Sequence, residues 1–367
     1  MMFSRVIGQR RVKEILRSGI RKNRLAHAYL LYGPEGAGME AIAIASAYSL
    51  LCRDKQAGGC GNCPECRRVS RLEHPAFRLV FPVPARPKSM PADKYQKVLR
   101  ERALQRMDDP YREISFLPEL TGIPAIGIDE IRSLKKEVIL KLTEDTDRVL
   151  VILSADKMTP AAANSLLKLL EEPPERTILF LTTTAQGMLL PTLVSRCQPV
   201  RFPPLPDDEI EEALVNRWNL STPRARFLAR MAGGNLTRAL ALNQDEFERQ
   251  REAAFVFLAE SIDPDPLKRL AAGDALIGNW DKTGLQTVFR LLRIFLRDWL
   301  HLASGNAELV INHDYTTKLS ALSQKHPAFR LSEGIERAGR AIDFIEKNVY
   351  LQLVVLCLSQ DLNRCKL

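Results

Sequence analysis

The stretch AHAYLLYGPEGAGMEAIAIASAYSLL, residues 26–51, decides the fold. Its first part, Ala26–Tyr32, is a short apolar run bounded by polar sequence and a Gly-Pro pair, and it predicts a buried strand. Its last part, Ala41–Leu51, is rich in small apolar residues and predicts a helix. Between them lies GPEGAGME, Gly33–Glu40, with the glycine spacing of a phosphate-binding loop. Strand, glycine loop and helix in this order are the context that such a loop requires.

The loop nevertheless lacks the side chains that hold a nucleotide. Met39 stands where a working loop has the lysine that bridges the terminal phosphates, and Glu40 stands where a Ser or Thr holds magnesium. At about 5 Å and an effective dielectric near 20, the like charge of Glu40 costs a bound phosphate on the order of 3 kcal/mol. We therefore expect a degenerate loop that binds no ATP tightly, formed by Gly33, Gly36, Gly38, Met39 and Glu40.

Two further apolar runs, Arg148–Leu153 and Thr177–Leu181, predict strands of a parallel sheet that is covered on both faces. Between them, Thr159 can cap a helix that the prolines at 173 and 174 stop. Alternating strands and helices predict an α/β domain.

The strand at 148–153 also lacks the acid pair of an ATPase. Leu153 and Ser154 stand where a metal-binding Asp and a catalytic Glu would be expected, and Asp156 lies two residues further on. Together with the altered loop, this predicts that the isolated chain does not hydrolyse ATP.

Four of the seven cysteines fall close together, at Cys52, Cys60, Cys63 and Cys66. Four thiolates can close a tetrahedral zinc site, which is structural because no coordination position stays open. A disulfide pair is the alternative, but no secretory signal is evident, and we therefore expect zinc in a cytoplasmic protein. His74 is a further candidate ligand, but a satisfied or exposed histidine is favoured because four cysteines complete the site.

The formal net charge of +9 favours a polyanionic neighbour, most simply nucleic acid, although a solvated basic face is an equal alternative. Between Arg5 and Arg24 there are eight basic side chains and one acid. No run of about 18 apolar residues exists, so no transmembrane helix is expected.

Changes of composition predict three domains. The segment Arg78–Pro124 is proline-rich and charged, and we expect an insertion or mobile loop with a helix at Lys94–Met107. Arg201–Ile210 predicts a linker, and the pattern beyond it is helical, with a strongly amphipathic stretch at 285–304. The expected domains are an α/β domain (1–201) with the cysteine module (52–66) and the insertion (78–124), a helical lid (202–243) and a helical C-terminal domain (244–367).

Three segments resemble the clamp-loader branch of the AAA+ proteins: QRRVKEILRSGIRKNRLAHAYLLYGPEGAG (9–38), SADKMTPAAANSLLKLLEEPPERTILFLTTT (154–184) and LPTLVSRCQPVRFPPL (190–205). The degenerate loop, the cysteine cluster and the intact Ser-Arg-Cys triplet together are similar to the delta-prime subunits of bacterial DNA polymerase III. The resemblance covers Val6–Cys66 and Ile126–Leu240, and the C-terminal third matches only in its helical character.

The resemblance implies a RecA-like AAA+ domain with a helical lid and an all-helical collar domain that oligomerises. It implies a subunit that does not hydrolyse ATP and that helps to load a sliding clamp onto primed DNA, in a hetero-pentamer with gamma/tau and delta subunits. The triplet Ser195, Arg196 and Cys197 implies an arginine finger, since the family's SRC arginine reaches the ATP of a neighbouring gamma or tau subunit. A guanidinium in trans is worth ~10³–10⁵ in rate. Thr182–Thr184 stand where the family has its sensor-1 polar group.

Two alternatives stay open from the sequence. The first is an active gamma-like ATPase with an unusual site, against which Met39, Glu40, Leu153 and Ser154 argue. The second is a zinc-dependent DNA-binding protein, for which the basic N-terminal stretch is the main support, with Arg132 as a candidate contact to the DNA backbone.

Overall fold

The computed structural model describes residues 2–54, 58–114, 116–117, 119–120, 122–139, 146–243 and 245–366. Met1, Gln244 and Leu367, at the ends of predicted domains, lie outside these residues, as does part of the cysteine module, Lys55–Ala57. The chain divides into two compact units. The first contains residues 1–219 and 232–241, and the second contains residues 220–231 and 242–367.

The first unit is built on a parallel sheet of five strands in the order β2-β3-β4-β1-β5. The central strands β1, β3 and β4 are nearly continuous apolar runs, as the sequence predicts. The edge strands β2 and β5 were not indicated by the sequence pattern, and β2 includes Arg78–Val80 of the predicted insertion. The strands are β1 (Ala28–Tyr32), β2 (Phe77–Val80), β3 (Arg148–Ile152), β4 (Thr177–Thr183) and β5 (Gln198–Arg201).

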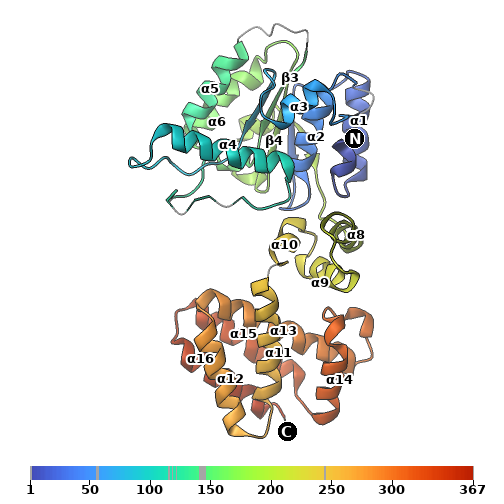
Figure 1. Ribbon diagram of the computed structural model, residues 1–367, viewed down its shortest axis with the longest axis vertical. Coiled ribbons are helices and arrows are strands. Elements are labelled where there is room, and N and C mark those ends of the chain that lie inside the picture. The colour runs from blue at the N-terminus through green and yellow to red at the C-terminus, as the bar shows by residue number, and fades with distance from the viewer. Residues whose placement is uncertain are drawn as a thin grey trace. The chain divides into compact units, whose positions relative to one another are not determined.

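Helices cover both faces of the sheet, with α5 and α6 on one side and α2 and α3 on the other (Figure 1). On one face, buried side chains of α5 and α6 pack on Leu30, Leu150 and Leu181. On the other face lies α2, which contacts β3 and β4. The helices of this unit are α1 (Arg10–Arg21), α2 (Met39–Leu51), α3 (Pro64–Ser70), α4 (Ala92–Asp108), α5 (Ile128–Ile139), α6 (Pro160–Glu171), α7 (Pro191–Val194), α8 (Asp207–Trp218) and α10 (Leu236–Ala241).

Local signals set several helix ends where the sequence places them. The Thr159 hydroxyl accepts a hydrogen bond from the Ala162 N–H at 3.3 Å and caps α6, which ends before Pro173. The helix α4, Ala92–Asp108, confirms the helix expected inside the insertion. The parallel sheet and the all-helical C-terminal part confirm the predicted α/β fold class.

The second unit is helical in its described residues, with α13 at its centre. α13 packs against α11 and α15, and its buried face carries Phe289, Phe295 and Trp299. This confirms the amphipathic helix predicted at 285–304. The helices are α9 (Thr222–Ala232), α11 (Asp245–Ser261), α12 (Pro266–Asn279), α13 (Lys282–Ala303), α14 (Thr316–Lys325), α15 (Leu331–Glu346) and α16 (Leu351–Arg364). Across the described residues of both units, no helix has the length and apolar character that crossing a membrane requires.

A buried carboxylate fixes the segment that follows α13. Asp298 is fully buried and accepts hydrogen bonds from the backbone N–H groups of Ile311 and Asn312, at 2.9 and 2.8 Å. The Asn312 side-chain amide donates to the same carboxylate at 2.6 Å, and its oxygen accepts from Arg251 at 2.9 Å. Removal of Asp298 would leave these donors buried without an acceptor.

We therefore predict that Asp298→Ala lowers the free energy of unfolding by about 3 kcal/mol, because several buried donors lose their partner. Urea denaturation followed by circular dichroism measures this change. Asp274→Ala, at an exposed position of α12, is the matched control and should change stability by less than about 0.5 kcal/mol. Similar losses in the two variants would contradict this account of Asp298.

Candidate functional site

The glycine loop joins β1 to α2 in the geometry of a phosphate loop. Gly36 and Gly38 have φ angles of 71° and 94°, which favour glycine, and Gly38 is the residue before the first turn of α2. Every residue of α2 except Glu40 is buried, so the loop is anchored to a helix in the core.

Atoms of neighbouring segments occupy the space that a side chain at each of three loop glycines would need. A Cβ on Gly33 would collide with the Phe202 carbonyl oxygen, and one on Gly36 would collide with the Asn235 side chain. A Cβ on Gly38 would lie 2.9 Å from the Tyr111 hydroxyl. The glycines thus allow the chain's own atoms to approach the loop closely.

The predicted insertion supplies one of these atoms, because its Tyr111 packs against the loop. Tyr111 is almost fully buried, and its hydroxyl accepts a hydrogen bond from the Ile7 N–H at 2.8 Å. The Arg217 guanidinium lies 5.7 Å from the centre of the Tyr111 ring and 3.2 Å from Asp109. The sequence suggested an insertion or a mobile loop, and the contacts of the described residues after α4 with the N-terminal residues and with α8 fit an insertion.

A second residue of the insertion neutralises the acid in the loop. Arg106 Nη1 lies 3.2 Å from Glu40 Oε2, an oxygen that is buried from solvent. Burial raises the pKa of Glu40, and the Arg106 charge partly opposes this shift. Arg106 also donates to the backbone oxygens of Pro110 and Arg112, each at 3.0 Å, so its guanidinium is held in place.

A cavity of about 310 Å³ remains beside the loop. Its lining includes Met39 and Glu40 from the loop, Arg106 and Tyr111 from the insertion, and Lys157, which the sequence analysis did not single out. Acids and bases share this small space, which leaves no excess of positive charge for a triphosphate. The acids that line it besides Glu40 are Glu35 and Glu113.

The residues at the carboxyl ends of β3 and β4, next to the loop, hydrogen-bond to one another. Leu153 and Ser154 line the cavity, and the Ser154 N–H donates to the Thr182 hydroxyl at 2.9 Å. The Thr183 hydroxyl donates to Asp156 at 2.6 Å. Asp156, the acid nearest to the missing acid pair, is thus engaged by the neighbouring strand.

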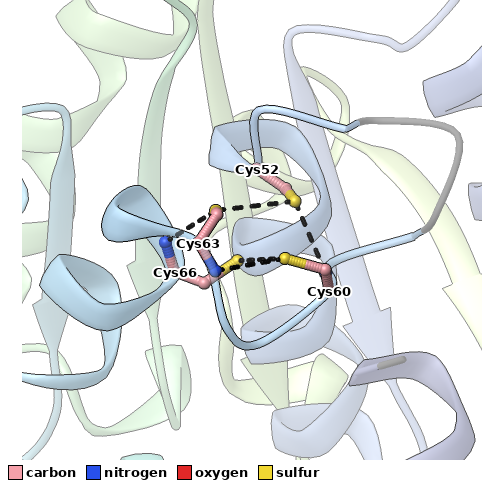
Figure 2. A group of neighbouring side chains, drawn as sticks. All are labelled: Cys52, Cys60, Cys63 and Cys66. Atoms are coloured by element: carbon pink, nitrogen blue, oxygen red, sulfur yellow. Dashed lines mark hydrogen bonds between the residues drawn. The ribbon is translucent and has the colours of Figure 1, made fainter.

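The four clustered cysteines point toward one another (Figure 2). Their sulfur atoms all lie within 4.8 Å of one another, with Cys52 and Cys63 at 3.9 Å and Cys60 and Cys66 at 4.0 Å. A tetrahedral zinc site with bonds of about 2.3 Å has edges of about 3.8 Å, so the sulfur positions fit zinc. None of the seven cysteines, all of which lie in the described part of the chain, forms a disulfide.

Backbone groups favour the thiolate form of Cys60, whereas burial raises the pKa of the Cys52 and Cys66 thiols. The N–H groups of Asn62 and Cys63 donate to the Cys60 sulfur at 3.4 and 3.3 Å, and they lower the pKa of that thiol. Thiolates are the form that binds metal. His74 is buried outside the cluster and lies 3.5 Å from Glu65, while its Nδ1 accepts from the Ala76 N–H. His74 is therefore a buried histidine with hydrogen-bonding partners, which agrees with the satisfied histidine that the sequence favoured over a metal ligand.

Arg196 lies directly after α7 and is turned toward the end of α6. Its Nη2 is 2.7 Å from the Glu171 carboxylate, and its Nη1 donates to the Thr192 carbonyl at 2.8 Å. About a third of its side chain is exposed. Cys197 is buried, and burial raises the pKa of its thiol to about 11, so it serves packing.

The sequence located the loop, the cysteines and Arg196, but it missed Arg106 and Tyr111. The only signal for these two was their place in a long insertion between two strands. A basic or aromatic residue in such a segment cannot be assigned to a site until the path of the chain is known.

We predict that the purified chain contains about one zinc ion and that Cys63→Ser loses it, because three sulfurs leave the tetrahedral site incomplete. Elemental mass spectrometry gives the metal content, and the melting temperature should fall with the metal. Cys357→Ser, at an exposed cysteine of α16, is the control and should keep the zinc. A metal-free wild type that is fully folded would exclude a structural zinc.

We also predict that Arg106→Ala lowers the free energy of unfolding by about 1–3 kcal/mol at pH 7, because Glu40 loses the cation that lies beside it. Loss of Arg106 raises the pKa of Glu40 further. A carboxyl whose pKa is raised by folding destabilises the folded state when it is charged. The loss of unfolding free energy in Arg106→Ala should therefore shrink as the pH falls toward 4.5, the ordinary pKa of a glutamate.

Denaturant titrations between pH 5 and 7 measure this dependence for wild type and variant. Lys97→Ala removes the same charge from an exposed position of the same helix. It should show neither the loss nor its pH dependence.

Comparison with known proteins gives a consistent assignment. The family model described as "DNA polymerase III, delta subunit" matches residues 8–206, more than half of the chain. A second one, "DNA polymerase III, delta subunit, C terminal", matches residues 274–351.

Three curated relatives are similar to this chain. DNA polymerase III subunit delta' of Bacillus subtilis is 30% identical, over 83% of this chain and 81% of that protein. Subunit delta' of Pseudomonas aeruginosa is 29% identical, over 72% of this chain and 68% of that protein. Subunit tau of Bacillus subtilis is 26% identical over 59% of this chain, but over only 31% of its own length. The chain therefore belongs to the delta-prime subunit family of DNA polymerase III.

Proposed function

We propose that this chain is a non-hydrolysing subunit of a clamp loader that helps to place a sliding clamp on primed DNA during replication. The main support for a chain that does not hydrolyse ATP is the packing of the insertion on the glycine loop. Arg106 neutralises Glu40, and Tyr111 occupies the recess against Gly38. The chain itself therefore fills part of the space beside the loop, and the cavity of about 310 Å³ that remains has no excess of positive charge in its lining.

In this proposal the catalytic contribution of the chain is Arg196, acting in trans. The guanidinium is at the surface, at the end of the short helix α7, where a neighbouring subunit can reach it. A planar cation with several N–H donors can neutralise the charge that develops on a transferred phosphoryl group. The ATP itself would be held by a gamma/tau subunit, with a delta subunit completing the hetero-pentamer.

The remaining parts fit supporting roles. The four cysteines would hold a structural zinc beside α2, which fixes the start of α3 without offering an open coordination position. We place the lid at 202–243 and the collar at 244–367. Exposed leucines on α12 and α16, two helices that pack together, support oligomerisation through the C-terminal domain: Leu267, Leu270, Leu353 and Leu356. We place this assembly in the cytoplasm, with the replicating DNA.

Direct contact with DNA is a second candidate function, favoured by one groove. Arg10, Arg11, Arg24 and Arg201 line it, and none of these four makes an ion pair with any residue that the structure describes. Unpaired cations in a groove attract a phosphate backbone. Arg132, the contact suggested by the sequence, is exposed and paired with Asp129 at 3.4 Å. An active gamma-like ATPase has no such support, because Met39 supplies no charge to the loop and Asp156, the acid nearest to the strand end, accepts a hydrogen bond from Thr183.

We predict that the chain alone shows no magnesium-dependent ATPase, and that the assembly with gamma-type and delta subunits, clamp and primed DNA hydrolyses ATP. Arg196→Ala in the assembly should lower kcat at least about tenfold, because the developing phosphate charge loses its cation. Steady-state phosphate release measures both.

Arg100→Ala is the control for loss of a surface charge, because it removes an exposed arginine that is also paired with a carboxylate, Glu73 at 3.0 Å, and it should retain ATPase activity. Hydrolysis by the isolated chain, or an assembly indifferent to Arg196→Ala, would refute the proposed function.

A further inference from the structure

The guanidinium of Arg196 is held from two sides. Nη1 donates to the Thr192 carbonyl and lies 3.4 Å from the Ser195 hydroxyl, both within the turn that carries Arg196. Nη2 lies 2.7 Å from Glu171 Oε1, at the end of a different helix. One nitrogen is thus engaged by the local turn, and the other is engaged by α6.

The backbones that carry the two charges are fixed relative to each other. α6 and α7 pack together through Leu166, Leu170 and Leu193, which belong to one buried cluster beneath the sheet. Glu171 is the last residue of α6, and the prolines that follow stop the helix. The carboxylate therefore stands at a defined place beside Arg196.

This ion pair is poorly placed to stabilise the fold. The side chains of Arg196 and Glu171 are 34% and 47% exposed, and water and salt weaken pairs that are this accessible. The contact instead restricts the rotamers of the Arg196 side chain. An arginine that is already held in one rotamer loses less conformational entropy when it binds a phosphate.

We propose that Glu171 is a positioning residue for Arg196: it holds the guanidinium in the orientation from which it meets the neighbouring subunit's ATP. This inference rests on the proposed function, in which Arg196 acts in trans. Glu171 itself touches no reacting atom. In this proposal the guanidinium lies between the Glu171 carboxylate and the phosphates, which that carboxylate would otherwise repel.

The test is a double-mutant cycle in the reconstituted assembly. Wild type, Glu171→Gln, Arg196→Ala and the double variant are compared by steady-state ATPase over a range of ATP concentrations. We expect Glu171→Gln to lower kcat about five- to tenfold with KM for ATP within about twofold, because only the orientation of the cation changes. In the Arg196→Ala background it should cause no further loss.

Glu172→Gln is the matched control. It removes the same charge one residue further on, and the carboxylate that pairs with Arg196 in the described structure is that of Glu171. It should leave kcat unchanged. Melting temperatures of the isolated variants, which should agree within about two degrees, exclude a loss of folding as the cause.

Each other outcome has a separate meaning. If Arg196→Ala lowers kcat but Glu171→Gln leaves it unchanged or raises it, the positioning role is refuted and the proposed function stands. An equal loss from Glu171→Gln with and without Arg196 also refutes the positioning role, because Glu171 then acts independently. If Arg196→Ala itself has no effect, the proposed function and this inference both fail.

Discussion

The burial of α2 is the constraint on which the site depends. Every residue of this helix except Glu40 is buried, so the helix can shift only if the core is repacked. The glycine loop before it is fixed in turn, and neighbouring segments fill the spaces that its glycines leave open. Glu40, the exception, faces the cavity and needs a counter-ion, which Arg106 provides from the insertion. The backbone geometry of the loop is thus held by packing, although Met39 stands where a phosphate-binding loop has its lysine.

The insertion contacts several parts of the first unit around the glycine loop. Tyr111 contacts the loop glycine and the N-terminal residues, while Asp109 pairs with Arg217 of α8. These contacts combine an aromatic ring, a hydrogen bond and an ion pair around one recess. Together they hold α8 and the N-terminal segment against the α/β core.

Arg196 belongs to a different region, where the constraint is weaker. Its backbone is fixed by buried leucines, but its guanidinium is partly exposed and shares its contacts between a carbonyl, a hydroxyl and a carboxylate. A side chain held in this way is ordered without being buried. It therefore remains available to a second charged group at the surface, whereas the side chains of Arg106 and Glu40 are only 17% and 23% exposed.

The sequence by itself determined what depends on local pattern. Apolar runs located the three central strands, Thr159 and the following prolines bounded α6, and the spacing of the cysteines indicated a metal cluster, because neighbouring residues suffice for each of these. The sequence also showed that the loop lacks lysine. The tertiary structure alone decided what fills the loop and what holds Arg196. Arg106 and Glu40 are far apart in the sequence, as are Tyr111 and Ile7, and short edge strands such as β5 take their pairing from neighbours. Contacts of this kind depend on the path of the whole chain, since no local propensity brings the two partners together.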